Sequence, residues 1–276
     1  MCLRLEWSII ENPDEVNLDS YLQLYRRNST VHLCIGWIVD LTLSGEMTIS
    51  HADAVIRNSC KAFIDNIHLH SQLYDVARCM LIYGDAFLFL AGWDKSNARL
   101  ELRQVPVSAL RIKVDTKGQV IGYAQPTDTG LIHRSLDEIV HFMWQPEKDA
   151  YYGTSMVRGI EQASCEKKQL LQLMMDGVKA LSTGKPFEHD LSDLVKRSRH
   201  VDREILDHFR VPTALAYGED TSKEELLRQF PRFDNLCEQL RRNLAETVEA
   251  SIFKRYAARK GLNEIPKLEF ERTWKA

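Results

Sequence analysis

The sequence of 276 residues lacks the short patterns by which common enzymes bind nucleotides or activate a nucleophile. It contains neither the phosphate loop G-x-x-x-x-G-K-[ST] nor the dinucleotide-binding loop G-x-G-x-x-G, so ATP is not an expected ligand. The serine-hydrolase pattern G-x-S-x-G is also absent. These absences exclude the common nucleotide-dependent enzymes and favour a structural or interaction role without a cofactor or a metal.

The sequence also has no excess of positive charge, with a formal net charge of −3. Proteins that grip duplex DNA by its phosphates usually carry a strong basic excess. This chain is therefore expected either not to bind nucleic acid or to touch DNA without holding it tightly.

Cysteine pairs and long apolar runs are missing as well. None of the six cysteines lies in a C-x-x-C pair, which argues against a zinc or thioredoxin-type site, and their wide spacing is typical of reduced, buried thiols. No apolar stretch approaches the roughly 20 residues of a membrane span, and the first residues lack the apolar region of a signal peptide. We expect a protein without membrane contact, made in the host cytoplasm.

The remaining composition is that of a globular protein, with 44% hydrophobic and 27% charged residues. Apolar residues at helical spacing predict a mainly α-helical α+β chain. The predicted helices are one capped by Asn17 or Asp19, then 31–43, 50–67, 74–82, one capped by Thr154 or Ser155, 190–209, and 222–261. Alternating or continuous apolar runs predict five strands of a small antiparallel sheet or barrel, and a terminal strand. The predicted strands are 86–90, 99–104, 110–115, 120–124, 139–144 and 267–271.

The last predicted helix carries six apolar residues at a constant four-residue spacing. Such a stripe drifts around an α-helix of 3.6 residues per turn, which predicts a bend or a crossing over several neighbours. Pro231 is expected to kink this helix or to mark its N-terminus. The residues of the stripe are Leu236, Leu240, Leu244, Val248, Ile252 and Tyr256.

No set of polar residues forms a recognisable active site. Ser155 is more typical of a helix cap than of a nucleophile. His68 and His70 lie two residues apart without a third metal ligand nearby. His141 lies inside an apolar strand, as a structural histidine does. A two-metal nuclease would need converging acids, and the spacing of the acids near the sheet does not require that. These acids are Asp75, Asp85, Asp137, Glu138 and Glu147.

Four segments, in order, resemble the portal proteins of tailed bacteriophages and archaeal head-tail viruses. Residues 81–88 read LIYGDAFL, similar to the glycine-containing helix-to-strand entry of that family. Residues 102–114 resemble its next strands. The most specific pair is DEIVHF at 137–142 followed by YGTSM at 152–156. Residues 203–215, which include VPTAL, resemble the segment before the family's tunnel loop. The resemblance covers about residues 75 to 272.

The resemblance implies three regions. Residues 1–152 correspond to a wing with a small β-barrel, and residues 153–209 to two stem helices. Residues 210–276 correspond to a tunnel loop, a long wing-to-crown helix and a terminal strand. The clip domain that family members carry between their stem helices is nearly absent, reduced to residues 182–190. The implied tunnel-loop residues are Tyr217, Gly218, Glu219, Asp220, Thr221, Ser222 and Lys223.

The implied function is a ring of about twelve copies at one capsid vertex, through which viral double-stranded DNA is packaged and ejected. The implied partners are the large terminase subunit, head-completion or adaptor proteins, and the major capsid and scaffold proteins. The basic run Lys196, Arg197 and Arg199 is a candidate for the channel wall, although such runs are more often solvated helix faces. Two alternatives stay open: a nuclease encoded by a mobile element, and a portal remnant, for instance in a prophage, that no longer assembles.

Overall fold

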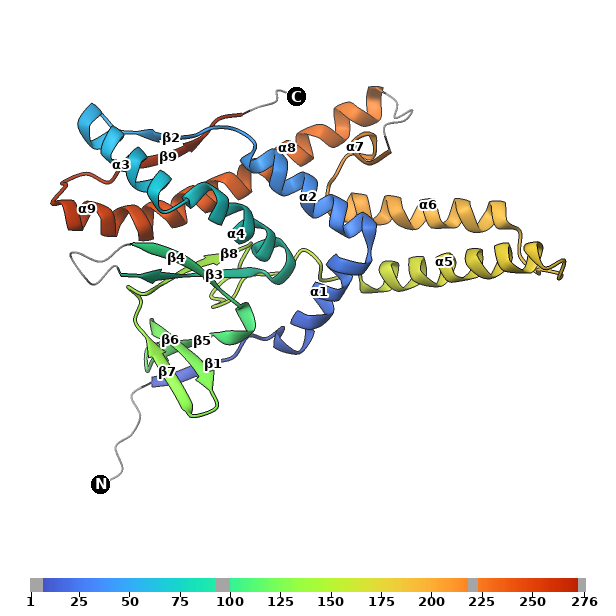
Figure 1. Cartoon of the computed structure of the whole chain (residues 1–276), viewed down its shortest axis with the longest axis horizontal. Coiled ribbons are helices and arrows are strands. Elements are labelled where there is room, and N and C mark those ends of the chain that lie inside the picture. Colours follow the sequence, from blue (N-terminus) through green and yellow to red (C-terminus); the bar gives the residue numbers. More distant parts are fainter. Residues whose placement is uncertain (1–6, 93–99, 218–222, 273–276) are drawn as a thin grey trace.

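The computed structural model describes residues 7–92, 100–217 and 223–272. They form a helical body, three β-sheets, and a two-helix arm that projects from the body (Figure 1). Within these residues, no helix combines the length and the hydropathy needed to cross a bilayer.

Four helices build the first part of the body, as the apolar spacing predicts. Their order is α1 (Leu18–Arg27), α2 (Ser29–Leu43), α3 (Ala54–Asn66) and α4 (Leu69–Tyr83), with a short 3-10 turn, η1 (Glu15–Asn17), before α1. The side chain of Asn28 begins α2 by accepting hydrogen bonds from the backbone N–H groups of Thr30 and Val31. Helix α4 starts five residues earlier than predicted, at Leu69.

The five central predicted strands divide between two antiparallel sheets rather than forming the one small antiparallel sheet or barrel that the sequence predicts. A three-stranded sheet has the order β4-β3-β8, a four-stranded sheet the order β1-β5-β6-β7, and β2 pairs with β9. The strands are β1 (Trp7–Ile10), β2 (Met47–Ser50), β3 (Asp85–Ala91), β4 (Glu101–Val105), β5 (Arg111–Asp115), β6 (Val120–Thr127), β7 (Gly130–Arg134), β8 (Ile139–Met143) and β9 (Lys267–Phe270), with the 3-10 turn η2 (Val107–Ala109) between β4 and β5.

The separation of the three-stranded sheet from the four-stranded sheet follows from the burial of β3, whose side chains are covered on both faces. Leu88 of β3 belongs to the core under the helices, whereas its neighbour Phe87 packs with the four-stranded sheet. The four-stranded sheet is strongly curled, because Trp7 on one edge strand lies 5.4 Å from His133 on the other, measured between ring centroids. Strands β1, β2 and β7 were not predicted, since each is only four or five residues long, too short for its residue pattern to be distinctive.

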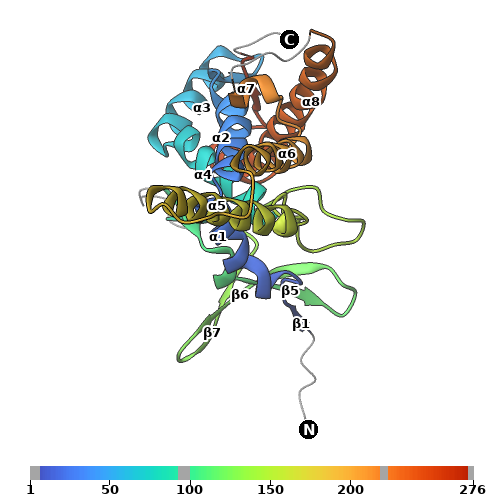
Figure 2. The same cartoon turned by 90° about the vertical axis from the view of Figure 1, so that its right-hand side faces the viewer.

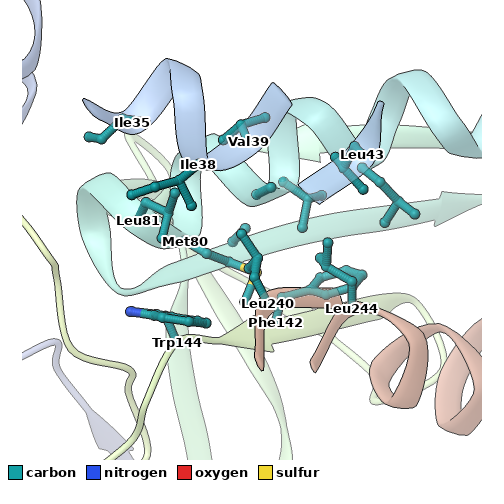
Figure 3. Packing of buried hydrophobic residues seen from close by; sticks show 14 of the residues in the cluster. Ile35, Ile38, Val39, Leu43, Met80, Leu81, Phe142, Trp144, Leu240 and Leu244 are labelled. Carbon is teal, nitrogen blue, oxygen red and sulfur yellow. The ribbon is translucent and has the colours of Figure 1, made fainter. Parts of the chain in front are cut away.

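The main core lies between the helices and the three-stranded sheet (Figure 3). Ile38 of α2, Met80 of α4 and Phe142 of β8 are fully buried and meet Leu240 of the last long helix. Three cysteines lie in this core, and burial raises the pKa of the Cys34 and Cys60 thiols to about 12 and that of Cys237 to about 11. The expectation of buried thiols is confirmed for these three and wrong for Cys165, which is exposed.

The last long helix is continuous but not uniform. It consists of α8 (Lys223–Val248), a π-helical turn η3 (Glu249–Phe253) and α9 (Lys254–Lys260). All six residues of the four-residue stripe are buried. The wider π-helical turn corrects the drift of this stripe, which keeps Ile252 and Tyr256 on the buried side. Pro231 lies inside α8 and does not mark its N-terminus.

Candidate functional site

The most distinctive feature is an arm of two antiparallel helices, α5 (Glu161–Ser182) and α6 (Leu191–His208) (Figures 1 and 2). Only residues 183–190 connect them, as the sequence predicts. Phe187 of this connection packs closely on Gly177 of α5. A Cβ added at Gly177 would lie 2.6 Å from the Phe187 ring. Asp190 caps α6 by accepting a hydrogen bond from the backbone N–H of Ser192 at 2.8 Å.

A buried polar network fixes the base of the arm to the start of α2. Lys167 of α5 forms an ion pair with Asp202 of α6, and its ammonium group donates a hydrogen bond to Thr30 Oγ1 at 2.6 Å. Thr30 in turn donates to Asp202 Oδ1 at 2.6 Å. One turn away, the Asn28 side-chain amide donates to Ser164 Oγ at 2.8 Å. These buried groups form hydrogen bonds with one another in place of water. They therefore fix the direction in which the arm leaves the body.

The basic run of α6 lies on the exposed surface of the arm. Lys196 and Arg197 form ion pairs with Asp193 and Glu166 at 3.1 and 3.2 Å. Exposed pairs of this kind contribute little to stability, so the residues remain available as a charged surface. Arg199 is exposed on the same helix. Their role as a channel wall stays a prediction.

The predicted tunnel loop is partly helical. Residues 214–217, expected as loop, belong to the short helix α7 (Thr213–Tyr217), and Lys223 already begins α8. The run of strong helix formers after Pro212 accounts for the difference. Gln229 of α8 accepts a hydrogen bond from the backbone N–H of Thr213 at 3.1 Å, which ties the two helices together. Gly218, Glu219, Asp220, Thr221 and Ser222 lie outside the described residues.

Two of the segments that resemble portal proteins cross at one buried junction, where α4 turns into β3. Gly84 and Gly153 approach so closely that a Cβ on Gly153 would lie 2.1 Å from the carbonyl oxygen of Gly84. Gly84 also accepts a hydrogen bond from the backbone N–H of Trp144 at 2.7 Å, and the Trp144 carbonyl accepts one from Thr154 at 2.7 Å. Glycine is needed here because two backbones are in direct contact.

Asp85 is the polar centre of this junction. Its buried carboxylate Oδ1 lies 2.7 Å from His141 Nε2 and accepts a hydrogen bond from the backbone N–H of Gly153 at 2.9 Å. The His141 ring also stacks on Phe87 with centroids 4.3 Å apart. The structural interpretation of His141 is thereby confirmed.

Ser155 is neither a nucleophile nor the cap of the first arm helix. Helix α5 begins six residues later, at Glu161. The buried Ser155 hydroxyl instead donates to the carbonyl oxygen of Ile82 at 2.5 Å and accepts a hydrogen bond from the backbone N–H of Val157. The prediction of Ser155 or Thr154 as a helix cap was wrong, because the segment after Gly153 first runs across the end of α4.

The other polar candidates lie apart from one another. His70 Nε2 lies 3.0 Å from the carbonyl oxygen of Leu43, and Asp75 pairs with Arg78. Asp137 pairs with Arg255, and Glu138 with Arg134. Across residues 7–92, 100–217 and 223–272, no three histidine, cysteine or acidic side chains gather as metal ligands would.

This chain is similar to known proteins in its fold and not in its sequence. No protein-family model matches the sequence, and no curated protein matches it either. Solved structures match over nearly the whole chain. One comes from the virion of the native gene transfer agent (GTA) particle, with 14% identity, a TM-score of 0.66, and coverage of 96% of this chain and 86% of that chain. Another comes from the neck of the native GTA particle computed with C12 symmetry, with 13% identity, a TM-score of 0.67, and coverage of 97% and 87%.

The chain has the fold of a GTA neck protein. A third match, from the neck of the empty GTA particle computed with C6 symmetry, has a TM-score of 0.68 at 14% identity. The GTA neck fold spans the body, the sheets and the arm, so it confirms the mainly α-helical α+β prediction. The matches come from the virion and from the necks of empty and native GTA particles, and what this chain shares with them is the fold.

Sequence reasoning missed the anchor of the arm. Lys167 and Asp202 lie 35 residues apart, and Thr30 lies more than 130 residues from either. The sequence around a lysine does not show that the lysine is buried, because an exposed lysine on a helix can occur in the same pattern of neighbours. The one usable hint was that Lys167 lies between Ser164 and Leu170, on the buried side of α5.

Proposed function

We propose that this chain is a portal subunit, which assembles into a closed ring of about twelve copies and forms a channel for double-stranded DNA at one vertex of a virion. The observation that carries the proposal is the fold match over 96–97% of the chain to virion and neck structures, one of them computed with C12 symmetry. The four portal-like segments of the sequence support it independently, since a resemblance in sequence does not depend on the fold.

The projecting arm takes the part of the stem in this proposal. Its two helices are held at a defined angle by the ion pair of Lys167 with Asp202, and they leave the body on the side away from the sheets (Figure 1). Residues 7–152 then form the wing, and α8 with α9 forms the long wing-to-crown helix. In the sequence, helix α7 and the five residues after it come between the arm and α8, where the tunnel loop of a portal would be.

The low net charge suits a conduit. A wall that bound phosphates tightly would slow the passage of DNA, because each neutralised phosphate adds to the binding free energy. The exposed basic residues of α6 are offset by neighbours such as Asp193 and Glu166. We propose that they touch DNA weakly and without sequence preference.

The short turn of the arm limits the contacts with a packaging motor. Residues 183–190 replace a clip domain, so a terminase or an adaptor protein would dock on this turn and on the ends of α5 and α6. In this proposal, the wing contacts the major capsid and scaffold proteins. These partners follow from the proposed portal role.

The mass of the assembled protein tests the proposal. Twelve chains of 31.9 kDa give a particle of about 380 kDa. We expect light scattering after size-exclusion chromatography to measure a particle mass near this value. A protein that stays at 31.9 kDa at high concentration would contradict the ring and would favour the non-assembling remnant. Magnesium-dependent DNA cleavage by the pure protein would favour the nuclease.

The tunnel-loop assignment makes a separate prediction. Replacing residues 218–222 by a glycine-serine linker of equal length should leave the melting temperature within a few degrees of the original, since helices α7 and α8 stay intact. Packaging or retention of DNA should fall, because the segment that would line the channel is changed. The assay is the amount of nuclease-protected DNA per particle, with unchanged ring mass as the control. A variant that fails to fold would place these residues in the core instead.

A further inference from the structure

A cleft of about 220 Å³ opens beside β4, at one edge of the three-stranded sheet. It lies where the start of α1, the end of α4 and the segment from β4 to η2 come together. Pockets that take whole small molecules usually enclose about 300–1,000 Å³. A cleft of this size therefore suits a single long side chain better than a cofactor.

The inner part of the cleft is apolar. Leu18 and Val107, which line it, are only 5% and 6% exposed. Cys79 adds a neutral thiol, since burial raises its pKa to about 11. The half-buried side chain of Tyr83 forms a further part of the wall. Such a lining suits the methylene groups of a long side chain that carries its charge at the tip.

Asp19 brings a carboxylate to the rim of the cleft. It is exposed, and it forms no ion pair with another of the described residues. Burial raises the pKa of the Tyr83 hydroxyl, and the negative charge of Asp19 adds to this rise, so the carboxylate lies near that wall. Nearby, Asp75 pairs with Arg78, and Arg26 lies about two turns farther along α1. The described residues that line the cleft thus include a carboxylate and no cation.

Strand β4 is open to pairing on one side. Among the described strands its only neighbour is β3, so alternate N–H and C=O groups of β4 point away from the sheet. Gln104 of β4 faces α4, because its side-chain amide donates to Cys79 Sγ at 2.9 Å. Residues that lie opposite each other on paired strands have their side chains on the same face. A residue paired with Gln104 on an added strand therefore directs its side chain toward the cleft.

We propose that the cleft binds an arginine side chain carried by an extended segment of a partner protein, and that this segment adds a strand to the open edge of β4. The methylene groups of the arginine lie along the apolar lining, and its planar guanidinium donates two parallel hydrogen bonds to the Asp19 carboxylate. Arginine suits the cleft better than lysine because a guanidinium also stacks on an aromatic ring, here that of Tyr83. Every group of the cleft belongs to one chain, so this inference does not depend on the ring.

Binding of a short peptide tests the site. The probe is a fluorescein-labelled, end-capped Val-Thr-Arg-Thr-Val peptide, and fluorescence anisotropy measures its affinity. We expect saturable binding that weakens about fivefold in Asp19→Asn, the effect of losing one exposed ion pair. The matched control is Asp128→Asn, an exposed carboxylate between β6 and β7 that does not line the cleft, and it should bind as the original chain does. No saturable binding at millimolar peptide, or equal binding by the original chain and Asp19→Asn, would overturn the inference.

A double-mutant cycle shows whether the two charges meet. Replacing the arginine of the peptide by norleucine keeps the apolar stem and removes the charge. This change should weaken binding about fivefold with the original chain and less than about twofold with Asp19→Asn. Equal losses with both chains would contradict the contact. N-methylation of the peptide on the backbone side that pairs with β4 should abolish binding, whereas free N-acetylarginine amide binding as tightly as the peptide would overturn the added strand.

The assembled protein separates this inference from the portal proposal. Rings should bind the peptide as well as single chains do, because the cleft is complete in one chain. Rings that exclude a peptide which single chains bind would show that a neighbouring copy covers the cleft, and would overturn the partner protein as its occupant. Peptide binding by a chain that never forms rings would support this inference and overturn the ring.

Discussion

Replacing Gly153 by alanine should destabilise the chain by about 3 kcal/mol, which is a large share of the marginal stability of a protein of this size. The added Cβ would lie 2.1 Å from the carbonyl oxygen of Gly84 and 2.6 Å from the backbone nitrogen of Trp144. Both are backbone atoms of a hydrogen-bonded junction, so neither can turn aside as a side chain would. Urea unfolding followed by circular dichroism measures the loss.

Gly36→Ala is the matched control for this substitution. Gly36 lies inside α2, and an added Cβ there meets no atom within 4 Å. Alanine favours the helix by about 0.5–1 kcal/mol over glycine, so the control should be as stable as the original chain or slightly more stable. A Gly153→Ala variant within about 1 kcal/mol of the original would show that the two backbones do not cross as described.

Replacing Lys167 by methionine should cost about 3 kcal/mol, because it leaves the carboxylate of Asp202 without its buried counter-charge. The figure belongs to the lower end of the range for buried pairs, since the Asp202 side chain keeps 14% of its surface exposed. Amide hydrogen exchange should rise at the base of α6 and in the first turn of α2, where Thr30 loses its donor. Chemical unfolding and exchange mass spectrometry provide the two measurements.

The neighbouring Lys168 supplies the control. It is exposed on the same helix, and Lys168→Met should change the stability by less than about 0.5 kcal/mol. Adding Asp202→Leu to Lys167→Met removes the unpaired carboxylate and should recover part of the loss, since an apolar pair can replace a buried ion pair. If the single and double variants were equally unstable, the cost would lie in packing rather than in charge.

The sequence predicts the helices well because their apolar residues recur at helical spacing over many turns. Helices α2, α6 and α8 were placed within a few residues, and the Val211-Pro212 stop after α6 was correct. The connection of the arm was also predictable, since the two apolar patterns leave too few residues for a further domain. All six predicted strands are found, because each alternates or is bounded by turn residues. Five of them agree within two residues at each end, and β6 continues three residues beyond its predicted end.

The sequence could not predict how the strands divide into sheets or what holds the arm. Phe87 and Leu88 are neighbours in one apolar run, and only the packing of helices on one face sends them to different cores. Ser155 is a second example. A serine just after a glycine is typical of a helix cap, yet the Ser155 hydroxyl donates a hydrogen bond to the carbonyl oxygen of Ile82, which lies 73 residues earlier. The anchor of Lys167, Asp202 and Thr30 depends on three segments that meet only in the fold.

Negative-stain electron microscopy of the purified chain tests the central claim most directly. If this chain is a portal subunit, particles at micromolar concentration should be rings with a central hole and about twelve-fold symmetry. Strictly monomeric particles at the same and at higher concentrations, from protein with the circular dichroism of a folded chain, would contradict it.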